Sequence, residues 1–303
     1  MNTRVFVTGA TGYLGGAIAA RLARAGHEVY GLTRNAERAA ALTALGVRPV
    51  LGDLAKRDTF MGALQNCDAV VHALYDEDDV AGRDQTALAA YRQAAQDGRV
   101  RRLLYTSGVW VLGDTGGEVF DESAPLQPLD LVAWRAAHED VALDLSEHEV
   151  TAMIFRPAIV YGESRGILGD LFAEARAKRT VSYPGDGSQY WGMVHRDDVA
   201  EAYALALEHG SNGERYLLAD ESQWTAREIA EAIARATGAT AQPWPRADVI
   251  EKLGPFGEAL LTSQKVTAAK ARRQLGWVPR HTSFVNEAEA LYREWQEQQA
   301  GVA

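Results

Sequence analysis

Three glycines at three-residue spacing are the residues of this chain whose pattern points most directly to chemistry. Gly9, Gly12 and Gly15 follow a short apolar run at residues 5–7 and precede a helical pattern at residues 17–25. Glycines in such a turn let the backbone bend tightly and approach a phosphate, and the next helix offers free N–H groups and its positive dipole end. The pattern therefore predicts a bound dinucleotide with its pyrophosphate on this turn. The residues predicted to bind it there are Gly9, Thr11, Gly12, Tyr13, Leu14 and Gly15.

The end of the second predicted strand indicates which dinucleotide is bound. Enzymes that use NAD usually place an acidic residue there to hold the ribose 2′-hydroxyl. This strand ends in Thr33 and Arg34, and a guanidinium can instead pair with a 2′-phosphate through its planar fork. We therefore expect NADP(H) rather than NAD(H), with Arg38, one helical turn further on, able to add a second charge. The alternative is that Arg34 is a solvated arginine at the start of a helix.

Two further strand ends supply candidates for the cofactor site. Asp53 follows the third predicted strand, where its carboxylate could accept from an adenine amino group while Leu54 packs on the ring. A plain turn with a helix cap is the alternative for Asp53. After the fourth strand, Ala73 and Leu74 let the backbone pass the cofactor. His72, just before them, is expected to be packed or bonded to backbone rather than to act as an acid or base.

Six motifs follow one another along nearly the whole chain. They are TGATGYLG from Thr8, GDL from Gly52, VVHA from Val70, YTSG from Tyr105, RPAIVYG from Arg156 and VHRDDVA from Val194, with LGWVP at residues 275–279. In this order they resemble the extended short-chain dehydrogenase/reductase family, which includes the sugar-nucleotide epimerases and dehydratases. The resemblance implies a cofactor domain and a C-terminal substrate domain with the nicotinamide at their interface. It also implies that Pro157 and Ile159 run past the carboxamide.

The catalytic pair of that family is changed in this chain. Members normally carry a tyrosine and, four residues later, a lysine on the same helix face, where the lysine lowers the phenol pKa and holds the nicotinamide ribose. If Glu139 aligns with the family's acid four residues after the lysine, Arg135 takes the lysine position and Leu131 the tyrosine position. Arginine keeps the positive charge but does not deprotonate, and leucine has no proton to give.

Another group must handle the proton if the chain is an enzyme. The family's Ser or Thr lies five residues before a glycine, and counting back from Gly113 gives Gly108, beside Ser107. Ser107 either takes over that role or bonds only to backbone. Tyr75, just after the fourth strand, is the first candidate for a replacement acid, and a proton from solvent with Ser107 polarising the hydride acceptor is the alternative. The predicted substrate pocket contains Trp134, Tyr190 and Trp191.

The order of the predicted elements determines how these residues are positioned. Apolar strands are expected at 4–8, 28–33, 47–51, 69–73, 102–105 and 151–155, alternating with helices at 14–25, 35–45, 57–65, 86–97 and 131–145. This alternation predicts an α/β fold, a doubly wound parallel (Rossmann) sheet with helices on both faces. We expect this domain over residues 1–160 with a return segment near 192–220, and a smaller α/β substrate domain over 161–303. Further helices are expected at 197–207, 226–237, 265–275 and 286–298, with a strand at 215–218.

Composition narrows the classes of protein. The chain has 303 residues, 47% of them hydrophobic and 24% charged, and a net charge of −10, which argues against nucleic acid or an anionic membrane as partner. Its single cysteine, Cys67, allows no internal disulfide. No apolar run is long enough to span a bilayer, and the first strand begins too early for a signal peptide, so we expect a cytoplasmic protein. The seven histidines show no ligand spacing, so we expect no metal site.

These observations give three functional hypotheses. The first is an NADP-dependent oxidoreductase that transfers hydride between the nicotinamide and a small carbonyl, imine or enone-like substrate. The second is a non-catalytic NADP(H)-binding sensor, because such a protein would not need the Tyr/Lys pair that this chain lacks. Epimerase or dehydratase chemistry comes third, because it needs an efficient base, and Leu131 stands where the family has its tyrosine base. The resemblance also suggests a homodimer formed through the helices at 86–97 and 131–145.

Overall fold

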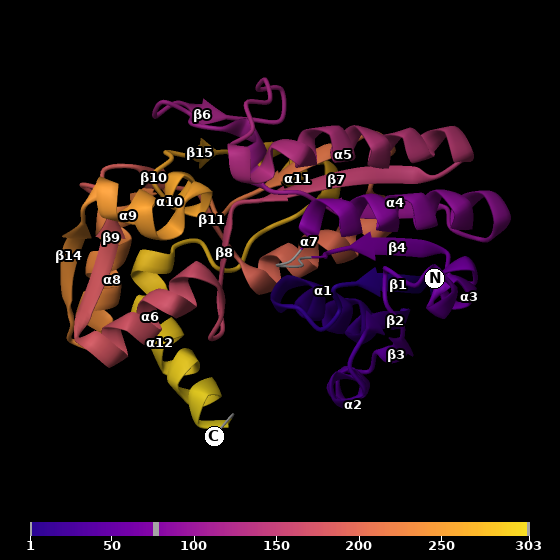
Figure 1. The fold of residues 1–303 in the computed structure, drawn as a ribbon, viewed down its shortest axis with the longest axis horizontal. Helices are drawn as coiled ribbons and strands as arrows, with labels where there is room; N and C mark the ends of the chain where they lie inside the picture. The colour runs from indigo at the N-terminus through magenta and orange to yellow at the C-terminus, as the bar shows by residue number, and fades with distance from the viewer. Residues whose placement is uncertain (1, 75–78, 302–303) are drawn as a thin grey trace.

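A seven-stranded parallel sheet forms the centre of the larger lobe in the computed structural model, which describes residues 2–74 and 79–301 (Figure 1). Across the sheet the strands are β12 (Arg215–Leu218), β7 (Thr151–Pro157), β5 (Arg102–Thr106), β4 (Ala69–His72), β1 (Arg4–Thr8), β2 (Glu28–Thr33) and β3 (Arg48–Leu51). The chain winds outward from β1 to β3 and then returns to β4 on the other side of β1. The doubly wound fold is confirmed, and the strand order reverses between β1 and β4, which is where ligands bind in such sheets.

Helices cover both faces of this sheet. One face is packed by α1 (Tyr13–Arg24), α2 (Ala36–Ala44), α7 (Arg196–His209) and α11 (Ala269–Leu275). The other is packed by α3 (Met61–Gln65), α4 (Val80–Asp97) and α5 (Ala133–Leu143). Since both faces are buried, the central strands are apolar almost throughout, as Val5, Phe6 and Val7 of β1 show with no exposed surface.

The smaller lobe lies at the opposite end of the molecule in Figure 1 and has its own apolar core. Its helices are α6 (Gly166–Lys178), α8 (Ala226–Thr237), α9 (Arg246–Leu253), α10 (Pro255–Leu260) and α12 (Phe284–Gly301). Its paired strands are β9 (Thr180–Pro184) with β14 (Thr240–Trp244), and β10 (Tyr190–Trp191) with β13 (Trp224–Thr225). Two further pairs are β8 (Ile159–Tyr161) with β11 (Met193–His195), and β6 (Val119–Phe120) with β15 (Lys265–Val266).

Some helix bounds differ from those expected. The helix predicted at 265–275 begins only at Ala269, because Lys265 and Val266 pair with β6. The helix predicted at 86–97 begins earlier, at Val80, where the Asp79 side chain accepts from the Gly82 amide. The expected helices at 57–65 and 131–145 are each divided into α-helix and flanking 3₁₀ turns, and α6, α9 and α10 were not predicted.

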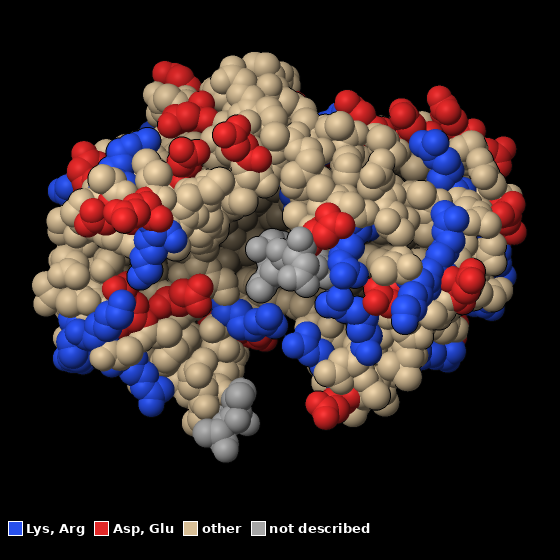
Figure 2. Space-filling model, in the orientation of Figure 1, with Lys and Arg blue, Asp and Glu red and all other residues tan. Residues whose placement is uncertain are grey.

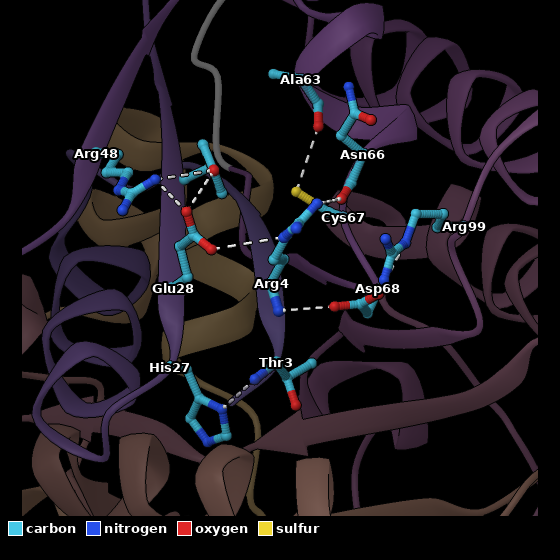
Figure 3. A network of polar contacts seen from close by, with 11 residues as sticks. Thr3, Arg4, His27, Glu28, Arg48, Ala63, Asn66, Cys67, Asp68 and Arg99 are labelled. Carbon is cyan, nitrogen blue, oxygen red and sulfur yellow. Dashed lines mark hydrogen bonds and ion pairs between the residues drawn. The ribbon is translucent and has the colours of Figure 1, made fainter. Parts of the chain in front are cut away.

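A network of polar contacts joins the amino-terminal ends of β1 and β4, at the edge of the sheet opposite to the glycine turn (Figure 3). The Arg4 amide donates to Asp68 at 2.9 Å, and the Arg99 guanidinium pairs with the same carboxylate at 2.8 Å. Cys67 is buried beside them and its thiol donates to the Ala63 carbonyl at 3.3 Å. Burial raises the pKa of the Cys67 thiol to about 12, so this cysteine is a packing residue rather than a nucleophile.

Candidate active site

The glycine turn between β1 and α1 has no room for a side chain at Gly9 or Gly15. Gly9 has φ +70°, and a Cβ built on it would collide with the carbonyl oxygen of Ala73 at the end of β4. A Cβ on Gly15 would collide with the Gly9 carbonyl, and the Gly12 amide donates to that same carbonyl at 2.8 Å. The N-cap residue of α1 is Gly12, which has no side chain with which to cap the helix amides. The turn is therefore a tight cradle opening onto uncapped helix amides, and it fits a pyrophosphate.

A groove of about 730 Å³ runs along the carboxyl ends of the strands and includes this turn. Its volume is in the range of small-molecule sites. The predicted cofactor residues that line it are Gly9, Thr11, Gly12, Tyr13, Leu14, Arg34, Asp53, Leu54, Ala73, Leu74 and Arg135. Other lining residues were not predicted from the sequence to bind the cofactor, and they include Arg83, Thr106, Arg165 and Gly166. The fold therefore gathers most of the predicted cofactor residues along one continuous surface.

Several predicted residues lie outside this lining. Pro157 and Ile159 are buried at the junction of β7 and β8. Trp191 is 3% exposed, donates from its indole nitrogen to the Leu260 carbonyl at 3.0 Å, and lines a separate cavity in the smaller lobe. The Tyr190 ring lies 3.7 Å below the Lys265 ammonium. Tyr75 lies outside the described residues.

Positive charge is concentrated in the groove. Among the residues that the structure describes, its lining contains Arg34, Arg38, Arg83, Arg135 and Arg165, and one carboxylate, that of Asp53. The Asp53 carboxylate already has two hydrogen-bond donors within the protein. It accepts from the Arg83 guanidinium at 3.3 Å and from the Ala55 backbone amide at 3.0 Å. Figure 2 shows blue side chains on both sides of the hollow between the lobes. In a chain of net charge −10, this local excess favours an anionic ligand.

Local hydrogen bonds shape the turn that follows β2 and contains Arg34. The Asn35 side chain caps α2 by accepting from the amides of Glu37 and Arg38, at 2.7 and 3.4 Å. The backbone amide of Asn35 in turn donates to the Thr33 hydroxyl at 3.2 Å. These local bonds fix the turn on either side of Arg34, whose side chain lines the groove.

Arg135 is held in a defined orientation beside the groove. Its Nη1 donates to the Thr106 carbonyl at the end of β5 at 3.0 Å, and its guanidinium carbon lies 4.6 Å from the Trp134 ring centroid. Leu131 lies in the 3₁₀ turn that leads into α5 and packs partly buried against the core. The position four residues before Arg135 therefore supplies apolar packing and no proton.

Ser107 follows Thr106 and is 7% exposed. Its amide donates to the Phe155 carbonyl at 2.7 Å, while within the described part of the chain its buried hydroxyl has no hydrogen-bond partner. Buried hydroxyls are almost always hydrogen-bonded, so an unpaired one at a strand end beside the groove is a donor that a bound molecule could satisfy.

A buried polar cluster lies at the carboxyl ends of β1, β4 and β5. The Asp84 carboxylate accepts from His72 Nε2 and His138 Nδ1, each at 2.8 Å, and from the Tyr105 hydroxyl at 3.0 Å. Burial alone would raise the pKa of Asp84, but the charge of His72, the hydrogen bonds from His138 and His72, and the charge of Arg135 hold that pKa below its ordinary value. His72 is thus packed, as expected, although its partners are side chains rather than backbone.

One buried ion pair attaches α5 to the sheet. Arg156 of β7 donates to Glu139 through Nε at 3.0 Å and through Nη2 at 2.5 Å, and both side chains are about 1% exposed or less. Glu139 is one helical turn after Arg135, so this bidentate pair also fixes the helix face that presents Arg135.

Within the described residues, no group of three or more His, Cys, Asp or Glu side chains could hold a metal ion. Over the same residues, no helix combines the length and the apolar character that crossing a bilayer requires.

Comparison with known proteins agrees with this geometry. The model of the NAD dependent epimerase/dehydratase family matches residues 5–219. A 4-hydroxy-2-methyl-3-oxo-4-farnesyl-3,4-dihydroquinoline-1-oxide ketoreductase of Stigmatella aurantiaca is 29% identical over 317 residues, covering 92% of this chain and 93% of that protein. A 3-diazoavenalumate denitrifying reductase of a Streptomyces species is 29% identical over 302 residues, covering 93% and 97%. Among solved structures, Thermus thermophilus UDP-glucose 4-epimerase in complex with NAD has a TM-score of 0.80 at 25% identity, covering 97% of this chain and 99% of the epimerase.

Proposed function

This chain belongs to the NAD dependent epimerase/dehydratase family, and we propose that it is an NADP-dependent oxidoreductase that reduces a small carbonyl, imine or enone-like compound. The observation that carries the proposal is the groove, where a glycine cradle and a row of arginines lie beside an oriented Arg135. The ketoreductase and the reductase among its relatives support reduction as the reaction type.

The arginines favour NADP(H) over NAD(H). The ribose 2′-phosphate adds negative charge next to the end of β2, where this chain has Arg34 and, one turn further, Arg38. A guanidinium binds phosphate oxygens bidentately, whereas a 2′-hydroxyl would be better held by a carboxylate, which this strand end lacks. Asp53 and Leu54 would lie against the adenine side of the same groove.

Each residue near the nicotinamide end has a proposed role. Bound NADPH supplies the hydride, which adds to the carbonyl carbon while a proton adds to the oxygen. Arg135 would hold the ribose hydroxyls with the N–H groups that do not bond to Thr106. The unpaired Ser107 hydroxyl would polarise the acceptor oxygen, and the proton would come from solvent or from Tyr75. Trp134 would form one side of the substrate pocket.

Leu131 is the reason that reduction ranks above epimerisation or dehydration. Those reactions begin by oxidising a hydroxyl, which needs a base to remove its proton. Neither Leu131 nor Arg135 can take that proton. A carbonyl already accepts hydride, and a donor hydroxyl with water can complete the reduction.

The experiment that tests the proposal separates binding from turnover. Purified protein is titrated with NADPH and NADH by nicotinamide fluorescence, and NADPH oxidation is then followed by absorbance against a panel of ketones, imines and enones. We expect tighter binding of NADPH and its steady oxidation by one class of substrate. Binding of NADPH without oxidation by any of them would instead support the non-catalytic sensor, the second candidate, which the apolar side chain at Leu131 favours.

The cofactor preference has its own test. Arg34→Ala should weaken NADPH binding much more than NADH binding, because only NADPH has the 2′-phosphate. Arg235→Ala, the same change at an exposed position on α8 outside the groove lining, is the matched control and should leave both affinities unchanged. Equal losses for the two cofactors at Arg34 would contradict the assignment.

We also propose that the chain forms a homodimer through α4 and α5, which lie side by side on the outer face of the larger lobe (Figure 1). Val141 of α5 is 36% exposed, which is high for a large apolar side chain. Sedimentation of the wild type should give a dimer, and Val141→Glu should give a monomer. A monomeric wild type would rule the proposal out.

A further inference from the structure

A loop of the smaller lobe is fastened to the glycine turn through Tyr13. The Tyr13 hydroxyl donates to the Gly162 carbonyl at 2.6 Å, and the backbone of Gly166, at φ +75°, packs against the Tyr13 ring. On the other side of the loop, Arg196 pairs with Glu163 and lies 5.6 Å over the same ring. Residues 162–166 are therefore held against the start of α1.

The Tyr13 phenol stays protonated and so keeps its hydrogen bond to the Gly162 carbonyl. Burial raises the pKa of the Tyr13 phenol, and the positive charges of Arg196 and Arg165 only partly oppose that rise. The phenol therefore stays protonated throughout the physiological range and remains a donor to Gly162.

Arg165 is the charged residue of this loop that lines the groove. It stands directly before α6 and lines the groove together with Gly12 and Arg38. The Glu163 carboxylate, two residues away, is occupied by Arg196. Within the described residues, the Arg165 guanidinium makes no hydrogen bond or ion pair of its own, so an external anion would meet no competing partner there.

The residues around Arg165 indicate which part of the proposed dinucleotide it would contact. Arg165 and Arg38 both line the groove and also an adjoining cavity of about 500 Å³ between α1 and α2. Gly12, the N-cap of α1, lines the same groove and cavity and has no side chain to cap the helix amides. Arg34 and Arg38 come from the β2 end, next to the proposed 2′-phosphate, whereas Arg165 reaches the start of α1 from the smaller lobe.

We propose that Arg165 binds the pyrophosphate of the dinucleotide from the smaller lobe, opposite the uncapped N-terminus of α1. The inference rests on the proposed dinucleotide binding and deepens it, because the cofactor then joins the two lobes at the contact that Tyr13 makes. A guanidinium can bond two phosphate oxygens at once, and the helix amides satisfy others. Tyr13 is a positioning residue in this arrangement, since its hydroxyl holds the loop rather than the phosphate.

The experiment compares cofactors that share the pyrophosphate. Arg165→Gln is titrated with NADPH and NADH by fluorescence, and with ADP-ribose and AMP by calorimetry. We expect about tenfold weaker binding or more for NADPH, NADH and ADP-ribose alike, as for loss of a charge-assisted hydrogen bond, with little change for AMP. Arg235→Gln makes the same change on exposed α8 and should leave all four affinities unchanged. Thermal melting of each variant shows that it is folded.

Other results would overturn the inference. A loss confined to NADPH would place Arg165 on the 2′-phosphate, and unchanged affinities would make it a solvated surface arginine. If the wild type binds neither NADPH nor NADH, the proposed function itself fails, and that result is distinct from the other two.

A double-mutant cycle tests the role of Tyr13. Tyr13→Phe removes only the hydroxyl that bonds Gly162, so it should weaken NADPH and NADH equally and by less than Arg165→Gln. If Tyr13 acts by placing Arg165, the double variant should bind no more weakly than Arg165→Gln alone. Additive losses would show that the two residues act independently.

Discussion

Asp84 on α4 accepts a 2.8 Å hydrogen bond from His138 on α5, and this bond joins the helix that carries Arg135 to the carboxyl ends of the central strands. The same carboxylate accepts from His72 at the end of β4. Asp84 is 1% exposed, so its charge is held by these donors rather than by water. Asp84 is therefore a second buried carboxylate, besides Glu139, that holds α5 next to the groove.

Asp84→Asn should destabilise the protein by about 2–3 kcal/mol, because the amide has the shape of the carboxylate but cannot accept from all of its buried donors. The free energy of unfolding is measured by urea denaturation at neutral pH. Asp97→Asn, an exposed change at the other end of the same helix, should have almost no effect. Equal stabilities of the Asp84 variant and the wild type would contradict the role assigned to the carboxylate.

Gly15→Ala should lower both the melting temperature and the affinity for NADPH. The added Cβ would collide with the Gly9 carbonyl and would lie 3.3 Å from the Ala73 side chain, so the glycine turn must open. Gly62→Ala on α3 is the matched control, since nothing lies within 4 Å of its added Cβ, and it should be neutral or slightly stabilising. Unaltered NADPH binding in Gly15→Ala would mean that the turn does not contact the cofactor.

Arg135→Ala should weaken the binding of NADPH and NADH to a similar degree, by about tenfold, because both cofactors share the nicotinamide ribose. Arg135→Lys keeps the charge but loses the planar fork that spans the Thr106 carbonyl and the groove, so its affinities should be intermediate. Fluorescence titration gives both values. Wild-type affinity in Arg135→Ala would remove Arg135 from the cofactor site.

Asp220 should make stability depend on pH. It is 4% exposed and bonded to Ser222 and Tyr161, and burial outweighs these bonds and raises its pKa to about 6. A carboxyl whose pKa is higher in the folded state binds a proton more tightly there, so its contribution to stability falls as pH rises from the unfolded value near 4 through 6. The change amounts to up to about 3 kcal/mol.

The variant Asp220→Asn keeps the shape of this group and cannot ionise. Relative to the wild type, it should gain stability between pH 4 and pH 7, and urea denaturation at the two pH values measures the difference. A difference between variant and wild type that stays constant with pH would show that Asp220 titrates normally in the folded protein.

Much of the fold could be predicted from the sequence because the information is local. Apolar runs of strand length alternate with helical patterns over the first half, and β2, β12 and α8 have the bounds that were expected. The helix predicted at 265–275 was wrong at its start, because Lys265 pairs with Val119 of β6, far away in the chain. Local propensity cannot indicate a pairing of that kind.

The candidate site divides in the same way. The sequence by itself determined the glycine turn, because spacing, a preceding strand and a following helix are all local, and it determined that Leu131 has no proton to offer. Tertiary structure decided which charges meet there. Arg165 reaches the groove only because the smaller lobe folds back and Tyr13 bonds Gly162, and Asp84 meets His138 only because α4 and α5 pack together. Both contacts join residues more than 50 positions apart, so their geometry follows from the packing of whole elements and not from any short pattern in the chain.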